Sequence, residues 1–161
     1  TYGCAPIATD RVRKGLAGVA PTESAAAPVD RGIYAPEWTE RTYAECLGLV
    51  EGLLFEGRRV VVDATFREEA RRRVFLDLAR SMRVPALVFE CRAPAEVVRS
   101  RLEHRSGDAS DADWGTYLAL ADRWEAYGPA TAPLVRPIDT SARDGDVRAA
   151  ARQALEIEDL A

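Results

Sequence analysis

In this 161-residue chain, the position of Asp63 suggests a chemical role. It directly follows three valines, Val60 to Val62, in the stretch RVVVDATFRE. An all-apolar run suits a strand buried on both faces of a parallel sheet. In such sheets ligands bind at the carboxyl ends of the strands. Asp63 therefore occupies the place of a catalytic or metal-binding carboxylate, or it only caps and solvates a strand end.

A second polar group lies near the amino end, in TDRVRKGL. Asp10, Arg13 and Lys14 are three to four residues apart, so they share one face of a helix that begins at Thr9 or Asp10. They could form a charged site. The simpler interpretation is a capping Thr9 or Asp10 followed by a solvated turn.

A third group consists of arginines in PAEVVRSRLEHR. Arg101 and Arg105 are four residues apart on one helix face, where like charges repel by a few tenths of a kcal/mol. A bound anion would reverse that sign, and planar guanidinium groups suit phosphate oxygens. His104, the single histidine, has no second histidine or organised carboxylate beside it and is predicted at the surface.

The elements that must position these residues alternate between strand and helix, which predicts a mostly parallel sheet covered on both faces. This is an α/β fold with three layers, α/β/α. Pro137 inside the last strand argues for an edge position. The predicted strands are Cys4 to Thr9, Val60 to Asp63, Pro85 to Cys91 and Leu134 to Asp139; the helices start near Asp10, Thr39, Thr65, Pro94, Ser110 and Asp144.

Several side chains also have a purely structural interpretation. Thr65 and Glu68 fit a capping box, as do Thr42 and Glu45. The run Arg71 to Arg73 is predicted to be a solvated helix face, and Ser110 to Asp113 is predicted to cap a helix that reaches about Tyr127.

Composition is that of one ordinary globular domain spanning residues 1–161, with a net charge of −4. No apolar run approaches the ~20 residues of a membrane-spanning helix. The arginines are dispersed among acids, which argues against nucleic acid. Cys4, Cys46 and Cys91 are predicted to be reduced, buried thiols of a cytoplasmic protein. The one lysine, Lys14, lies in RKGLAG, so the sequence contains no GxxxxGK[ST] phosphate loop.

Five segments together resemble a known group of proteins. TDRVRKGLAG, GIYAPEWTERTY, VVVDATF, VFECRAPAEVVRSRLEHR and SDAD occur in the order seen in the P-loop kinase-like proteins of the zeta-toxin, gluconate-kinase and polynucleotide-kinase group. The resemblance is strongest to the bacterial "AAA family ATPase" domain, which is often fused to an aminoglycoside-phosphotransferase-like domain. It covers residues 7–140.

The resemblance implies a P-loop NTPase-like parallel sheet of strand order 2-3-1-4-5. The family's strand 1 and its GxxGxGKS loop precede the segment that matches TDRVRK, and this sequence contains neither. Removing a central strand leaves two rows of backbone groups unpaired. The sequence is therefore expected to be part of a longer chain, with a rearranged sheet without nucleotide binding as the alternative.

The same resemblance implies roles for individual residues. Asp10 would orient or deprotonate an acceptor hydroxyl, and Arg13 would hold the acceptor or its phosphate. Asp63 would act on Mg²⁺, directly or through water. Arg101 and Arg105 would bind the nucleotide and neutralise the transferring phosphoryl group from a lid at about residues 101–113.

The function expected from this resemblance is ATP-dependent phosphotransfer to a small hydroxyl-bearing acceptor, with ATP and Mg²⁺. It requires Asp10, Asp63, Arg101 and Arg105 to converge on one cleft. The alternatives are a nucleotide-binding or ATPase module that serves a fused or associated partner, and a non-catalytic remnant. The sequence does not specify the acceptor.

Overall fold

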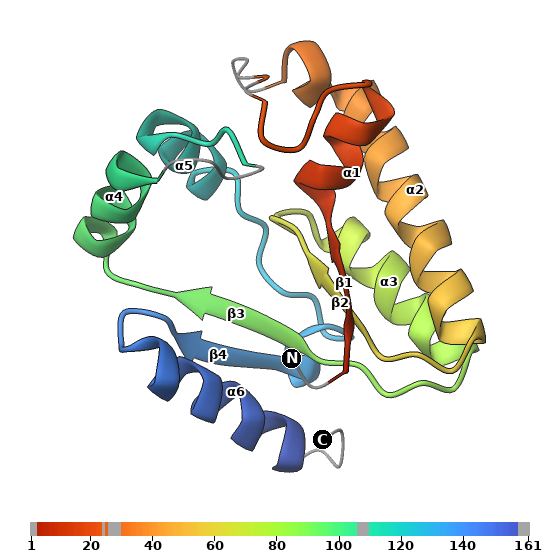
Figure 1. Cartoon of the computed structure of the whole chain (residues 1–161). Coiled ribbons are helices and arrows are strands. Elements are labelled where there is room, and N and C mark those ends of the chain that lie inside the picture. The colour runs from red at the N-terminus through yellow and green to blue at the C-terminus, as the bar shows by residue number, and fades with distance from the viewer. Residues whose placement is uncertain (1–2, 24, 26–29, 106–109, 158–161) are drawn as a thin grey trace.

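The computed structural model describes residues 3–23, 25, 30–105 and 110–157. Within these, four strands alternate with helices as predicted (Figure 1). The strands are β1 (Ala5–Ala8), β2 (Val60–Asp63), β3 (Val88–Arg92) and β4 (Val135–Asp139). The α-helices are α1 (Thr9–Leu16), α2 (Pro36–Phe55), α3 (Glu69–Ser81), α4 (Ala95–His104), α5 (Trp114–Ala121) and α6 (Asp144–Ile157), and two short 3₁₀ turns are η1 (Gly32–Tyr34) and η2 (Ala132–Leu134).

The strands form two separate parallel pairs. β1 pairs with β2, and β3 pairs with β4. In the family order 2-3-1-4-5, β1 and β2 correspond to strands 2 and 3, and β3 and β4 correspond to strands 4 and 5. The two observed pairs are therefore the pairs that flank strand 1, and the strand pairing agrees with the predicted fold. Between the described parts of β2 and β3 there is no hydrogen-bonded ladder, and Figure 1 shows the two pairs set apart.

The main core lies between the β1–β2 pair and α2. Ile7, Cys46 and Val50 are buried together, and Val60 and Val62 pack against them. Val61 points to the other face and is 51% exposed. The prediction that this strand is buried on both faces is therefore wrong for Val61, because in this structure α2 covers only one face of the pair.

Helix starts differ from the predicted capping patterns. Pro36 begins α2, so Thr42 lies inside the helix and its hydroxyl donates to the Trp38 carbonyl at 2.7 Å. For α5 the predicted cap at Ser110 to Asp113 is confirmed, since Asp113 accepts from the Thr116 amide at 2.7 Å, but the helix ends at Ala121 and not near Tyr127. The aromatic and glycine residues after Ala121 instead form a loop that contacts Glu69 and Arg72 at the start of α3.

That loop is held by Arg72, a residue that is only 2% exposed. The guanidinium lies 5.3 Å from the centre of the Trp124 ring and 4.8 Å from that of Tyr127. It also donates to the carbonyls of Glu125 at 2.7 Å and Phe66 at 2.6 Å. The predicted solvated face of Arg71 to Arg73 is correct only for Arg73.

Glu69 completes this cluster. Its carboxylate pairs with Arg72 at 2.9 Å and accepts from the Thr131 hydroxyl at 2.6 Å. It also lies so close to Gly128 that a Cβ there would meet Glu69 Oε1 at 2.6 Å, so a larger residue at this position would have to displace the Glu69 carboxylate. Burial raises the pKa of Glu69, but the hydrogen bonds from Thr131 and Arg72 outweigh it and lower the pKa below its ordinary value.

This lowered pKa predicts a loss of stability in acid. The unfolded carboxyl titrates near pH ~4.3. The stabilisation is therefore present above that pH and is lost as the pH falls through the lower folded pKa. Urea midpoints measured between pH 6 and pH 3 should fall for the natural protein and fall less for Glu69→Gln. The exposed Glu51 on α2 provides the control, since Glu51→Gln should retain the full dependence of the urea midpoint on pH. If the urea midpoint fell equally with pH in both variants, the prediction would be contradicted.

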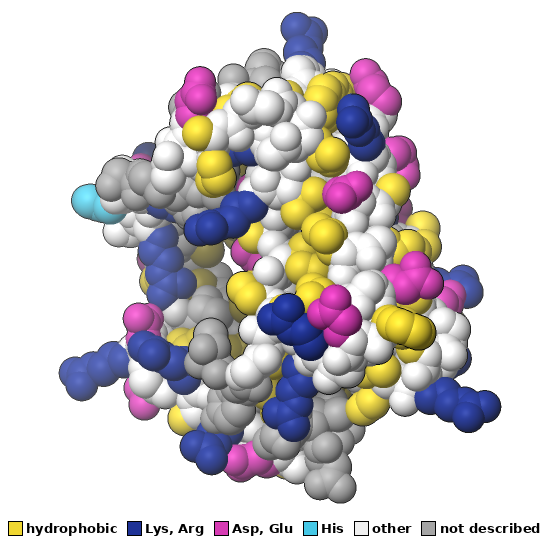
Figure 2. All heavy atoms as spheres, turned by 45° about the vertical axis from the view of Figure 1, so that its right-hand side comes forward, with side chains coloured by type: hydrophobic (Ala, Val, Ile, Leu, Met, Phe, Trp, Pro, Cys, Tyr) yellow, Lys and Arg dark blue, Asp and Glu magenta, His cyan; other side chains and the backbone are white. Residues whose placement is uncertain are grey.

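The surface carries charges of both signs. On the face turned forward in Figure 2, hydrophobic side chains lie between acidic and basic ones. Exposed hydrophobic residues of the α2–α3 side include Leu49, Phe55 and Val74. Among the described cysteines, Cys46 is buried and Cys4 half-buried, whereas Cys91 is exposed, contrary to its predicted burial. His104 is exposed as predicted, with Nδ1 2.7 Å from the Ser100 carbonyl. None of the described helices is long and apolar enough to cross a membrane.

Candidate functional site

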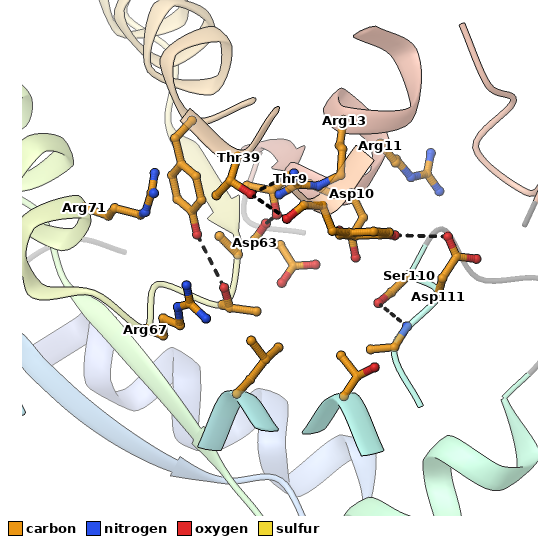
Figure 3. Close-up of a pocket in the computed structure, with 18 of the residues that line it drawn as sticks. Thr9, Asp10, Arg11, Arg13, Thr39, Asp63, Arg67, Arg71, Ser110 and Asp111 are labelled. Atoms are coloured by element: carbon orange, nitrogen blue, oxygen red, sulfur yellow. Dashed lines mark hydrogen bonds between the residues drawn. The ribbon is translucent and has the colours of Figure 1, made fainter. Parts of the chain in front are cut away.

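A cavity of about 530 Å³ lies at the carboxyl ends of β1 and β2. This volume is in the range of small-molecule sites. Figure 3 shows Arg67 and Arg71 on one side of the cavity and Ser110 and Asp111 on the opposite side. The polar residues that line it come from α1, η1 and the residue Asp30 before it, α2, the end of β2 and the turn after it, α3, the end of α4, the segment before α5, and α5 itself. They include Thr9, Asp10, Arg11, Arg13, Asp30, Tyr34, Thr39, Tyr43, Asp63, Thr65, Arg67, Glu68, Arg71, Arg105, Ser110, Asp111 and Thr116.

The parallel register brings Asp10 and Asp63 to the same end of the strand pair. Ala8, the last residue of β1, is the register partner of Asp63, the last residue of β2. Asp10 follows in the first turn of α1, where a carboxylate is favoured by the helix dipole. Thr9 is not a side-chain cap, since Ala8 is the N-cap residue; its hydroxyl instead donates to the Asp63 carbonyl at 3.2 Å. This hydrogen bond ties the two strand ends together.

Arg13 lies one helical turn after Asp10 and is 6% exposed. Its guanidinium donates to the Ile33 carbonyl at 2.9 Å and to the Thr39 hydroxyl at 3.2 Å. Burial lowers its pKa, while the nearby Asp10 carboxylate raises it. Within the described residues, the buried Nε–H of Arg13 has no hydrogen-bond partner. Arg13 also lines the cavity, so a small shift of its guanidinium toward a bound ligand could give this donor a partner.

The turn after β2 contacts an aromatic residue of α2, Tyr43. Phe66 has a φ of +43°, which non-glycine residues seldom adopt. Its amide donates to the Tyr43 hydroxyl at 3.3 Å, and its ring packs edge-on against that of Tyr43. Helix α3 then begins at Glu69 with Glu68 as its N-cap residue. The predicted capping box is therefore wrong: Thr65 caps no helix and faces the cavity.

The two arginines expected to act together lie in different places. Arg105 lines the cavity, and its guanidinium donates to the Ala112 carbonyl. Arg101 lies outside the cavity, where its guanidinium donates to the carbonyl and hydroxyl of Thr140, after β4. The expected convergence thus holds for Asp10, Asp63 and Arg105 and is wrong for Arg101 in this conformation. Thr140, which itself hydrogen-bonds to the end of β3, supplies the competing acceptors.

Part of the cavity was not predicted from sequence. Arg71 stacks over the Tyr43 ring at 4.6 Å and pairs with Glu68 at 2.8 Å. Asp111 lies within hydrogen-bond distance of Tyr34, at 3.0 Å. Each of these contacts joins residues that are tens of positions apart or depends on a helix start that the capping patterns misplaced, so no local signal indicates them.

The donor set is compatible with a phosphate-bound cation. Among the described residues no group of three or more His, Cys, Asp or Glu side chains could hold a metal ion. Mg²⁺ commonly uses one or two protein carboxylates and completes its shell with water and substrate phosphates. Asp63 at the cavity wall fits that role. These residues do not fit a site in which protein side chains alone surround the cation.

The fold and the cavity at its strand ends define a P-loop kinase-like domain. The AAA_33 family, described as an AAA domain, matches residues 2–126, so the chain belongs to this family. The family is that of P-loop kinase-like proteins, which generally use ATP and Mg²⁺.

Relatives of known sequence extend well beyond this chain. It is 30% identical over 121 residues to the uncharacterized protein Rv2004c of Mycobacterium tuberculosis and equally to the uncharacterized protein Mb2027c of Mycobacterium bovis. These matches cover 75% of this chain and 24% of each relative. The chain thus spans about a quarter of the length of the curated relatives it matches.

Two solved structures share the fold. The gluconokinase from Sinorhizobium meliloti 1021 superposes with a TM-score of 0.60 at 15% identity, covering 98% of this chain and 82% of the gluconokinase. The Deinococcus radiodurans tunicamycin resistance protein gives a TM-score of 0.55 at 18% identity, covering 99% and 84%. At these identities the likeness establishes the fold alone.

Proposed function

We propose that this chain is part of an ATP-dependent phosphotransferase that acts on a small hydroxyl-bearing acceptor. One observation carries the proposal: Asp10 and Asp63 line the same cavity at the carboxyl ends of a parallel strand pair. Of two carboxylates placed there, one can face the acceptor and take its proton, and the other can face the nucleotide and its Mg²⁺.

In this proposal Asp10 accepts the proton of the acceptor hydroxyl as its oxygen forms a bond to the terminal phosphorus of ATP and the bond to ADP breaks. Arg13 holds the acceptor through its guanidinium at the cavity wall, and Arg105 faces the negative charge that spreads over the phosphoryl oxygens. Mg²⁺, held on the side of Asp63, would supply further charge neutralisation when bound with the nucleotide. Arg101 joins only if the lid at about residues 101–113 moves its guanidinium away from Thr140.

The separation of β2 and β3 supports a second part of the proposal. We place the phosphate-loop strand between them, supplied by residues outside this sequence. Among the described residues β2 pairs only with β1 and β3 only with β4, so one backbone edge of each strand lies outside the two ladders. A parallel strand at this position would pair both free ladder edges and bring its carboxyl end, with the loop, beside Asp63.

ATP binding by the full-length protein tests the nucleotide side. Isothermal titration with ATP and Mg²⁺ should give saturable binding, which Asp63→Asn should weaken about tenfold or more because a contact to a charged group is lost. Asp77→Asn, on the exposed face of α3, is the matched control and should bind normally. Absence of ATP binding by the natural protein, or equal affinities for all three proteins, would overturn the proposal.

A second candidate is a nucleotide-binding or ATPase module that serves a fused or associated partner. It is favoured by the length of the relatives, of which the matched region is only 24%. A screen of sugars, nucleosides and aminoglycosides for phosphorylated product separates the two: a phosphotransferase forms product, whereas a module hydrolyses ATP at a rate that no acceptor changes.

A further inference from the structure

The only lysine of the chain is fully buried on α1. Lys14 is 0% exposed. Its Nζ donates to the carbonyls of Glu23 at 2.8 Å and Pro21 at 3.3 Å, and it lies 3.2 Å from Asp111 Oδ2. All three ammonium protons thus have partners. A buried cation satisfied in this way fixes the segments that carry its acceptors.

The same oxygen of Asp111 serves two further donors. The Tyr34 hydroxyl donates to Oδ2 at 3.0 Å, and the Ala25 amide donates to it at 3.2 Å. Burial opposes the charged carboxylate, but these hydrogen bonds and Lys14 keep the pKa of Asp111 below its ordinary value. One carboxylate oxygen therefore joins α1, the chain after α1 and η1 to the segment that leads into α5.

Tyr34 extends this connection to the acceptor side of the cavity. The Arg13 guanidinium lies 5.0 Å from the centre of the Tyr34 ring, within cation–π distance. Arg13 also donates to the carbonyl of Ile33, the residue before Tyr34. The position of the Tyr34 ring therefore sets both a stacking surface and a hydrogen-bond acceptor of Arg13, whereas Asp111 itself makes no direct contact with Arg13 among those the structure describes.

We propose that Asp111 is a positioning residue that aligns the Arg13 guanidinium in the cavity through the Tyr34 hydroxyl. Residues 110–112, the segment that carries Asp111, line the cavity, so the docking of this segment and the alignment of Arg13 are coupled. The assignment of Arg13 to an acceptor rests on the proposed phosphotransfer; the coupling between Asp111 and Arg13 does not.

Hydrogen exchange of individual protons tests the coupling in the full-length protein. Tyr34→Phe removes one hydroxyl and leaves the ring over Arg13. The double variant Lys14→Met/Asp111→Leu removes the whole ion pair without leaving an unpaired buried charge. Asp113→Asn, two residues from Asp111, keeps the cap of α5 and is the matched control.

In Tyr34→Phe and in the double variant, the hydrogen bond from the Tyr34 hydroxyl to the Asp111 carboxylate is lost. Because a hydrogen bond to a charged group is worth about tenfold or more, the Nε–H of Arg13 should exchange faster by about that factor when measured by NMR. The Ala25 amide should exchange faster only in the double variant, and Asp113→Asn should change neither proton. An unchanged Arg13 Nε–H in Tyr34→Phe would overturn the proposal, even if the double variant fails to fold. So would a folded double variant in which Ala25 exchanges faster and Arg13 does not, since Asp111 would then only anchor the chain. Neither measurement uses ATP or an acceptor, so the outcome is independent of the proposed activity.

Discussion

Replacing Asp10 with asparagine is expected to lower the phosphotransfer rate of the full-length protein by about 10²–10⁴-fold, the usual contribution of a positioned general base. Asparagine retains the size of the side chain and a hydrogen-bonding oxygen, but it cannot take the proton of an acceptor hydroxyl. Asp10 is suited to that task because, within the described residues, no hydrogen bond or ion pair occupies its carboxylate, although it lies near Arg13.

The measurement is the initial rate of acceptor-dependent ADP formation, with ATP affinity measured in parallel by titration. ATP affinity should change little in Asp10→Asn, because the nucleotide side is assigned to Asp63. Asp77→Asn provides the matched control on the exposed face of α3 and should retain both rate and affinity. A variant that loses ATP binding together with activity would place Asp10 on the nucleotide side and contradict its proposed role.

The order of elements was predictable because it depends on local periodicity. The valines before Asp63 and the helical spacing after Asp10 predicted a strand and a helix, and both are present. The family resemblance added the prediction that the two carboxylates converge on one cleft, and the parallel register brings them to the same edge of the strand pair. The candidate site was therefore predictable wherever a residue lies at the junction of a strand and the helix that follows it.

Predictions from helix-capping patterns failed for a physical reason. Thr9 and Thr65 have the residue type of a cap, but the turns that follow parallel strands use them differently. The hydroxyl of Thr9 ties one strand end to the other, and the turn at Thr65 is set by the strained backbone of Phe66 and its contact with Tyr43. A cap is a local interaction, whereas these are contacts between segments more than 20 positions apart, and a sequence window does not contain them.

The arginines show the same limit. Neighbours on one helix turn, Arg71, Arg72 and Arg73, have side chains 13%, 1% and 59% exposed. Only tertiary contacts distinguish them, since Trp124 and Tyr127 lie more than 50 positions away from the guanidinium that they enclose. Arg101 differs from Arg105 likewise because Thr140, from another strand end, lies within its reach.

Arg72 should consequently be the arginine on which folding depends most. Its guanidinium donates to four backbone carbonyls, at Phe66, Arg67, Glu125 and Ala126, and pairs with Glu69. These carbonyls belong to the turn after β2 and to the loop after α5. Removing the cation would leave the acceptors buried without a donor and Glu69 without its counter-charge, an arrangement that costs far more than the lost contacts.

Arg72→Met is therefore expected to lower the free energy of unfolding by about 3–5 kcal/mol, as for one partner removed from a buried ion pair. Methionine retains much of the apolar stem of arginine, so the loss reports the guanidinium group, with its charge and its hydrogen bonds. Arg73→Met is the matched control on the next position of α3: its side chain is 59% exposed and its oxygen partner lies at 3.9 Å, so it should change stability by less than about 1 kcal/mol. Urea unfolding followed by tryptophan fluorescence reports the difference directly, because Trp124 stacks on Arg72. Similar midpoints for the two variants would show that Arg72 is dispensable to the fold and that the loop after α5 is held by other contacts.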